Sequence, residues 1–127
     1  MANAPTITLN ENAKAWVAAL RSGDYTQTQK MLRRVTKENG TSFCCLGVAC
    51  DLYRNTVGGN WDTIVLADSE LTPAVMDWLG LEDSIGTYYN ANGNNFTLVG
   101  LNDNEYFTFA QIADVIKSQP KGLFHTE

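Results

Sequence analysis

The sequence predicts one small α+β domain in which about four helices pack on short antiparallel β-hairpins. Apolar residues recur at helical spacing in several separate segments, and two Asn-Gly dipeptides lie between short strand-like stretches. A chain of 127 residues with 44% hydrophobic residues is large enough to build one core. We expect the whole chain, 1–127, to be this domain, with an ordered core over about 6–118 and a loose tail over 119–127.

The first expected helix covers residues 9–21. Thr8 and Glu11 have the spacing of a capping box, and Gly23 is a suitable stop signal. The inward side chains recur at i, i+3, i+4 and i+7: Ala13, Trp16, Val17 and Leu20. The next segment, "YTQTQKMLRRV", is expected to continue as a short helical turn with Met31 and Leu32 pointing inward. A hairpin around the dipeptide at 39–40 then leads to the cysteines.

A second helix is expected over residues 45–54, inside the segment "SFCCLGVACDLY". Its apolar positions again follow helical spacing, and Gly47 within it predicts close packing against another backbone. A third helix, over 73–79, is indicated by Thr72 as N-cap, Pro73 at the first helical position and Gly80 after the end.

The last third of the chain predicts a second hairpin and a final helix. Aromatic and aliphatic residues flank the Asn-Gly dipeptide at 92–93, which is typical of a hairpin turn. Thr108 and Gln111 repeat the capping-box spacing ahead of an apolar stripe, so a helix is expected over 109–118. One core is expected to join the inward stripes of all the helices: Trp16, Leu20, Cys45, Val48, Leu52, Leu79, Phe109, Ile112 and Ile116.

Charge and segment composition exclude several classes of function. With 9 Lys and Arg against 14 Asp and Glu, the net charge is −5, the wrong sign for a protein that neutralises nucleic-acid phosphates. No apolar run approaches the roughly 18 residues of a membrane span, and the N-terminus has no signal-peptide pattern. We therefore expect a cytoplasmic protein with neither a nucleic-acid partner nor a membrane partner. No phosphate-binding glycine loop is present either.

The three cysteines predict neither a disulfide framework nor a metal site. Their number is odd, and Cys44, Cys45 and Cys50 contain no CxxC pair. The one histidine, His125, lies close to the C-terminal end of the sequence. A zinc site would have to recruit carboxylates, which structural sites seldom use. No metal and no other cofactor is expected.

The order of several motifs resembles that in a set of short uncharacterised proteins found in bacteriophages and actinobacterial genomes. The motifs are "WVAALRSG", "FCCLGVACDL", "WLGL", "LND" and "FTFAQIADVI", and together they span residues 16–116. The resemblance implies a viral or prophage setting, hence the cytoplasm of a host cell. It implies no particular activity.

Cys44 is the candidate nucleophile. A thiol just ahead of a helix can have a lowered pKa, and the chain order Cys44, Asn102, His125 permits a catalytic trio. The alternative interpretation is that the cysteines fill the core as small hydrophobic residues. Two adjacent cysteines within an apolar run favour packing over chemistry.

The candidate binding residues are Tyr88, Tyr89, Asn102 and Asp103. The tyrosine pair, surrounded by asparagines, could stack on a planar ligand, although such pairs usually place one ring in the core and one outside. The two polar residues of "LND" are expected in a turn, where they either contact a ligand or bond their own backbone. A basic cluster around Arg33 and Arg34 is a further candidate, for a phosphate or an acidic partner.

These observations predict a small non-catalytic binding protein of phage type. It would act by occupying a host protein or by sequestering a small molecule. The alternative, from a different class, is a cysteine-dependent hydrolase or transferase that uses Cys44 as its nucleophile. A third possibility is a minor structural protein of a virion, for which the sequence supplies neither repeats nor a coiled coil.

Overall fold

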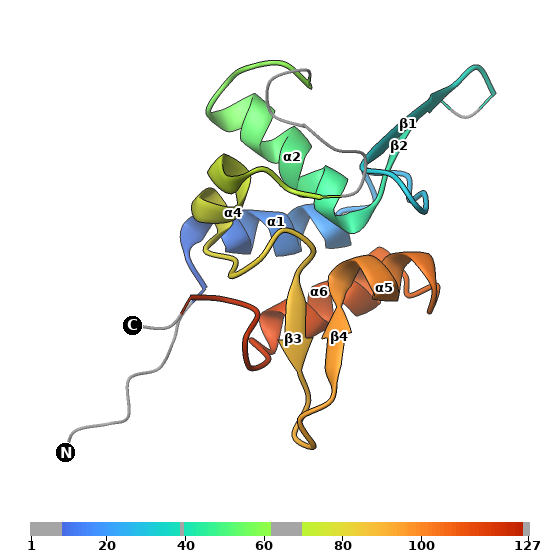
Figure 1. Ribbon diagram of the computed structural model, residues 1–127. Helices are drawn as coiled ribbons and strands as arrows, with labels where there is room; N and C mark the ends of the chain where they lie inside the picture. The colour runs from blue at the N-terminus through green and yellow to red at the C-terminus, as the bar shows by residue number, and fades with distance from the viewer. Residues whose placement is uncertain (1–8, 39, 62–69, 126–127) are drawn as a thin grey trace.

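The computed structural model describes residues 9–38, 40–61 and 70–125 and confirms the α+β class (Figure 1). Within these ranges there are five helices and two separate two-stranded antiparallel sheets. The helices are α1 (Glu11–Arg21), α2 (Cys45–Thr56), α4 (Pro73–Leu79), α5 (Leu98–Asp103) and α6 (Phe109–Lys117). The strands are β1 (Arg33–Thr36) and β2 (Gly40–Phe43) in one sheet, and β3 (Thr87–Tyr89) and β4 (Asn95–Thr97) in the other.

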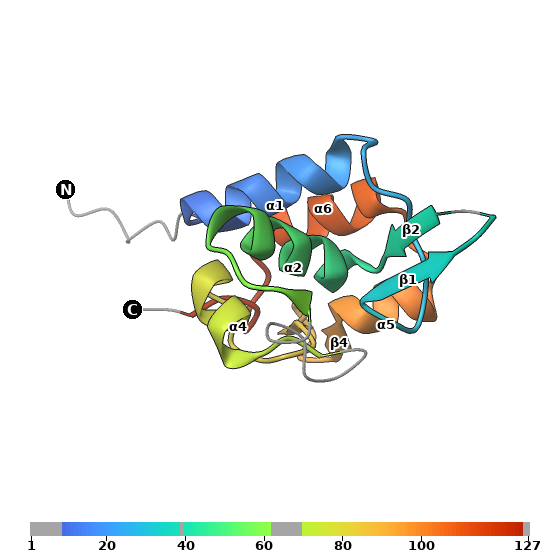
Figure 2. The same cartoon turned by 90° about the horizontal axis from the view of Figure 1, so that it is seen from above.

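The helices pack mainly on one another, and the two hairpins lie at the edges of the domain. Helix α1 packs against α6 on one side and α2 on the other, while α4 and α5 each pack against α2 (Figures 1 and 2). We expected the helices to pack on the hairpins. In the structure they pack mainly on one another, and the hairpins contribute less to the packing than expected. No helix in the described ranges combines the length and apolar character required to span a bilayer.

The helix ends follow local capping chemistry. Helix α1 begins after Asn10, whose side chain accepts a hydrogen bond from the Ala13 backbone N–H at 2.7 Å. The expected capping residue Thr8 lies outside the described residues. The helices predicted over 73–79 and 109–118 are confirmed. Helix α4 starts at Pro73, and its C-cap Gly80 adopts the left-handed conformation. Helix α6 has the complete capping box at Thr108.

The helical turn predicted for residues 25–35 is wrong. The Thr28 backbone N–H donates to the Phe43 carbonyl at 2.8 Å, and the Phe43 N–H donates to the Thr26 carbonyl at 2.8 Å. This segment therefore runs extended beside the end of β2 before it enters β1. Leu32 is buried as expected, whereas Met31 is half-buried. Long-range backbone pairing overrides the local preference for a turn of helix.

The prediction that Gly47 packs closely on another backbone is confirmed. A Cβ atom at Gly47 would overlap the carbonyl group of Leu32, reaching 2.7 Å from its carbon. The Cys44 N–H also donates to the Leu32 carbonyl at 3.2 Å. The first turn of α2 thus lies directly against the main chain leading into β1, because a glycine leaves room for it.

Helix α5 was not predicted. The side-chain oxygen of Thr97 accepts from the Gly100 N–H at 2.8 Å, which turns the chain from β4 straight into a helix of six residues. As a result, "LND" forms the last turn of a helix instead of a turn between a strand and a helix. Asn102 points into the core, where it is fully buried.

The core joins the inward faces of all five helices. Of the nine residues expected there, eight are buried, and Leu52 is partly buried and packs against the others. The largest fully buried side chain is Trp16, whose indole N–H donates to the Cys45 carbonyl at 2.9 Å.

The described part of the expected loose tail, through His125, is held against the domain. Leu123 is fully buried, and its carbonyl accepts from the Glu82 N–H at 3.0 Å. The Lys121 carbonyl accepts from the Tyr89 N–H, and the His125 N–H donates to the Gly80 carbonyl, both at 2.8 Å. The tail therefore packs along β3 and the segment after α4, through backbone bonds that no local pattern predicts.

Candidate functional site

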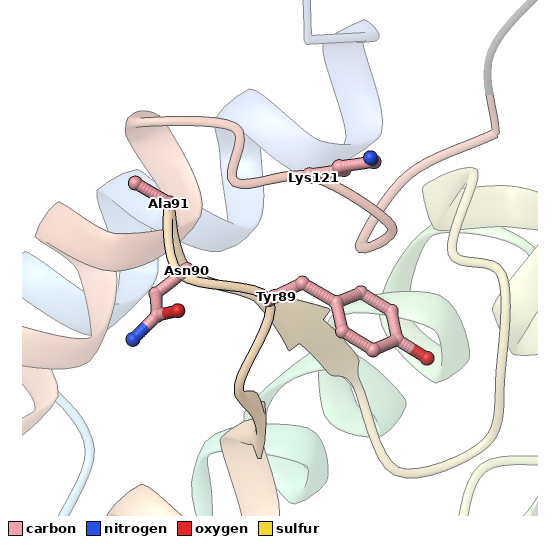
Figure 3. Close-up of a pocket in the computed structure, with 5 residues that line it drawn as sticks. Tyr89, Asn90, Ala91 and Lys121 are labelled. Carbon is pink, nitrogen blue, oxygen red and sulfur yellow. The ribbon is translucent and has the colours of Figure 1, made fainter.

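A cleft of about 580 Å³ lies between the β3–β4 hairpin and the C-terminal segment (Figure 3). We call it the hairpin cleft, and its lining is Tyr89, Asn90, Ala91, Gly93 and Lys121. It combines an aromatic ring, polar amide groups and one ammonium group. That is a mixture of apolar surface and a few polar groups, as is usual in small-molecule sites.

The hairpin turn is fixed by its own side chains. The Asn90 side-chain oxygen accepts from the backbone N–H groups of Asn92 and Asn94, at 2.9 and 3.0 Å. Gly93 adopts φ +82°, a conformation that a residue with a side chain rarely takes. The asparagine-rich segment therefore closes the turn itself, which makes it a preformed wall of the cleft.

Of the two tyrosines, Tyr88 is buried and Tyr89 is exposed, which is the arrangement expected for such a pair. Tyr88 is 9% exposed, and its ring stacks on Phe96 with centroids 5.6 Å apart. Burial raises the pKa of the Tyr88 hydroxyl. Tyr89 is 41% exposed, and its side chain points away from that of Asn90 (Figure 3). Tyr89 is thus the tyrosine that a ligand can reach.

Gly122 holds the ring of Tyr89 in place. A Cβ atom at Gly122 would lie 2.8 Å from Cδ2 and 2.9 Å from Cε2 of Tyr89, so the glycine backbone packs on the ring. Together with the backbone bond from Tyr89 to Lys121, this contact orients the ring before any ligand arrives. Lys121 and Gly122 belong to the segment that was expected to be loose, so sequence reasoning missed both.

Asn102 lies in the interior and connects three segments. Its side-chain oxygen accepts from the Cys45 N–H at 3.2 Å and from the Gln27 side chain at 2.8 Å. Its amide group donates to the Thr28 carbonyl at 2.8 Å and to Asp103 at 2.9 Å. Asn102 is therefore not accessible to a ligand as expected, because these bonds use the whole side-chain amide and 0% of the residue is exposed.

Asp103 belongs to the same polar group and not to the hairpin cleft. Besides Asn102, its carboxylate accepts from the backbone N–H of Lys30 at 2.8 Å. Lys30 adopts φ +71°, unusual for a residue with a side chain, and this bond helps to hold it there. The structure thus brings Asn102 and Asp103 together but does not bring them to the tyrosines.

The three cysteines are free and buried. Burial raises the pKa of Cys44 to about 11 and that of Cys50 to about 12, and it raises the pKa of Cys45 as well. Cys44 is the N-cap of α2, as expected, yet it is only 4% exposed. Desolvation outweighs the helix terminus, so a thiolate is disfavoured at neutral pH.

His125 is not placed to activate Cys44. Its Nδ1 atom lies 2.8 Å from a carboxylate oxygen of Glu82, at the surface. The C-terminal segment lies at the opposite end of the domain from the start of α2 (Figures 1 and 2). The structure therefore does not bring Cys44, Asn102 and His125 together as a catalytic trio. Nor do the described residues contain a cluster of three His, Cys, Asp or Glu side chains suited to a metal ion.

A second cleft, of about 420 Å³, lies between the β1–β2 hairpin and α2. We call it the arginine cleft, and its lining is Arg33, Thr41, Phe43, Asp51, Arg54 and Trp61. The guanidinium carbon of Arg33 lies 4.9 Å from the centroid of the Trp61 ring. Arg33 belongs to the basic cluster predicted from the sequence, whereas Arg54 and Trp61 were not among the predicted site residues.

The basic cluster expected around Arg33 and Arg34 is divided by the hairpin. Arg34 turns to the segment before β1, where its Nε donates to the Thr28 hydroxyl at 3.1 Å and its Nη2 to the Gln29 carbonyl at 3.4 Å. Successive residues of a strand face opposite sides, so only Arg33 reaches the arginine cleft.

These features define a small, predominantly helical α+β domain whose described residues line the hairpin cleft and the arginine cleft. Residues 9–120 match the model of the family described as Domain of unknown function (DUF8296), so the chain belongs to that family. No curated protein and no solved structure matches the chain.

Proposed function

We propose that the protein is a small non-catalytic binding protein that sequesters a small molecule in the hairpin cleft. The single observation that carries the proposal is the preformed wall around Tyr89, whose ring is half-exposed and held by Gly122, in a cleft that Lys121 also lines. A volume of about 580 Å³ falls within the range of small-molecule sites.

The chemistry of the lining favours a planar ligand with an acidic group. A ring can stack on Tyr89, while an anionic group can pair with Lys121 at the rim. A fixed aromatic side chain loses little conformational entropy when a ligand binds, and this favours its use as an anchor. The motif resemblance supports a phage setting, and with it we propose the cytoplasm of a host cell as the location.

The hydrolase alternative has one supporting observation, the position of Cys44 as the N-cap of α2. Its burial, its raised pKa and the distant location of His125 argue against it. A nucleophilic cysteine requires both a thiolate and a nearby base. We therefore keep binding as the proposed function.

A ligand-observed NMR screen with aromatic carboxylates tests the proposal. We expect saturable binding that Tyr89→Ala weakens by about tenfold or more, the loss typical of a binding hot spot. Lys121→Ala should weaken the binding of acids but not of their neutral amides. Lys14→Ala removes an exposed lysine elsewhere, on α1, and should leave affinity unchanged.

Two outcomes would overturn the assignment. If binding persists in Tyr89→Ala but fails in Tyr106→Ala, the site lies on the other exposed tyrosine, in the turn after α5. If a host protein is captured through Tyr89 while no small molecule binds, the cleft is a docking site for a protein. In both cases, circular dichroism of each variant shows whether the domain is still folded.

A further inference from the structure

We propose that the arginine cleft is a second binding site, specific for a small organic phosphate monoester whose phosphate lies between Arg33 and Arg54. This site is independent of the hairpin cleft, because the two clefts have no lining residue in common. The proposal is supported by how the walls of the cleft are built, by the charge of its lining and by the chemical groups that the lining offers.

The β1–β2 register places three of the lining side chains on one face of the hairpin. Arg33 pairs with Phe43 across the strands, and Thr41 lies two residues before Phe43 on the same strand. Cross-strand partners and residues two apart in a strand share a face. The guanidinium group, the hydroxyl and the phenyl ring are therefore directed to the same side, toward α2.

Helix α2 supplies the opposite wall, where Asp51 orients Arg54. Nη2 of Arg54 lies 2.9 Å from Oδ1 of Asp51, and Oδ2 of Asp51 accepts from the Tyr25 hydroxyl at 2.7 Å. The Asp51 side chain is only 13% exposed, so this arrangement is partly shielded from water. Arg54 is thus held in place, while its Nε–H is enclosed without a hydrogen-bond partner in the described structure.

Arg33 provides a positive charge that none of the described carboxylates neutralises. Among the described residues it has no salt bridge, and it lies over the Trp61 ring. Among the described lining residues, the two arginines and Asp51 sum to a charge of +1, on a chain with a net charge of −5. Such a local reversal of sign attracts an anion.

The lining matches a phosphate monoester better than a carboxylate. Two guanidinium groups and the Thr41 hydroxyl offer donors from three directions, which suits the three terminal oxygens of a phosphate. A carboxylate has two oxygens and is satisfied by one guanidinium group. The rings of Phe43 and Trp61, with centroids 5.9 Å apart, offer apolar surface for the organic part of the ligand. The volume of about 420 Å³ accommodates a small molecule.

Phenyl phosphate is a suitable probe, and the indole N–H signal of Trp61 is a suitable readout. The chain has three tryptophans, so an amide correlation spectrum contains three indole signals, and Trp61→Phe identifies the one to follow. We expect phenyl phosphate to shift that signal saturably. The signal of Trp16, whose indole N–H is bonded inside the core, should not move.

Matched arginine variants test the assignment. Arg33→Gln should weaken phenyl phosphate binding by about tenfold or more, the effect expected for losing one charge-assisted contact. Arg34→Gln removes the adjacent arginine, which faces away from the cleft, and should leave affinity within about twofold. Arg33→Gln leaves none of the described carboxylates unpaired, so it should remain folded even if Arg54→Gln does not.

Three results would each contradict this site. Equal loss of binding in Arg33→Gln and Arg34→Gln would indicate non-specific attraction and overturn the proposal. Tighter binding of benzoate than of phenyl phosphate would assign the cleft to carboxylates instead. Loss of phenyl phosphate binding in Tyr89→Ala, with Arg33→Gln unaffected, would move the ligand to the hairpin cleft. Binding that is weakened in Arg33→Gln and retained in Arg34→Gln and Tyr89→Ala supports the arginine cleft, whether or not the hairpin cleft binds anything.

Discussion

The side-chain oxygen of Asn102 accepts a hydrogen bond from the backbone N–H of Cys45, 57 residues earlier in the chain. This bond satisfies one of the free N–H groups at the start of α2, a task for which the N-cap residue Cys44 uses no side-chain bond. The two most distinctive motifs of the sequence, "FCCLGVACDL" and "LND", are therefore in direct contact. Their physical role is to join α2 to α5.

Replacing Asn102 with alanine should destabilise the domain by about 2–4 kcal/mol, because it leaves several buried polar groups without partners. Urea unfolding followed by circular dichroism measures the change. Asn102→Asp keeps the acceptor for Cys45 but places a buried charge beside Asp103. Its stability should recover in part as the pH falls. An Asn102→Ala variant as stable as the original protein would contradict this account.

Gly47→Ala should destabilise the domain by about 3 kcal/mol or more, because the added methyl group meets the backbone of Leu32, which cannot rotate away. In an ordinary helix the same change stabilises, by roughly 0.5–1 kcal/mol. The sign of the effect is therefore the test, and thermal unfolding measures it. A rise in melting temperature would show that α2 and the Leu32 segment are farther apart than described.

The cysteines should react slowly with iodoacetamide in the native protein near neutral pH and rapidly after unfolding in urea. Burial both blocks access and raises the pKa of Cys44 to about 11, so little thiolate forms. Mass spectrometry after timed quenching counts the modified thiols. One cysteine alkylated within the mixing time in native protein would revive the hydrolase alternative.

Asp83 should make the domain sensitive to acid. Partial burial raises its pKa, but this is outweighed by hydrogen bonds from Thr87 and from the N–H groups of Ile85 and Gly86, and the net pKa is lowered. The native state therefore favours the carboxylate. Its stabilising contribution is complete above the ordinary pKa of about 3.9 and disappears as the pH falls through the lowered native value.

The variant Asp83→Asn isolates that contribution. It should unfold at lower urea concentration than the original protein at neutral pH, and the difference should shrink below about pH 4. Asp77→Asn, on the exposed side of α4, is the control and should behave like the original protein. A difference that stays constant with pH would show that the carboxylate charge is not involved.

Local chemistry made much of the fold predictable. Pro73 and Gly80 delimit α4, and the Thr108 capping box starts α6, because these signals act within a few residues of the helix they delimit. Helix α5 was missed because six residues are too few for an apolar period, so Leu98 was interpreted as part of a strand. The extended segment before β1 was missed because its partner, Phe43, lies about fifteen residues away along the chain.

The candidate site was predictable only in part, for the same reason. An exposed ring in the pair at 88–89 follows from strand alternation, and Tyr89 is that ring. The polarity of "LND" was noticed, but sequence alone did not show that Asn102 points inward. Lys121 and Trp61 reach the two clefts through contacts between distant segments, which no local pattern predicts.

The hairpin cleft is built from residues on both sides of the point where the family match ends. The family match ends at residue 120, whereas Lys121, which brings the charge to the hairpin cleft, and Leu123, which anchors the segment, come just after it. The hairpin cleft therefore takes four of its lining residues from inside the matched region and its ammonium group from just beyond it. A substitution at Lys121 alone thus changes the charge of the cleft without altering the matched region or the buried side chain of Leu123.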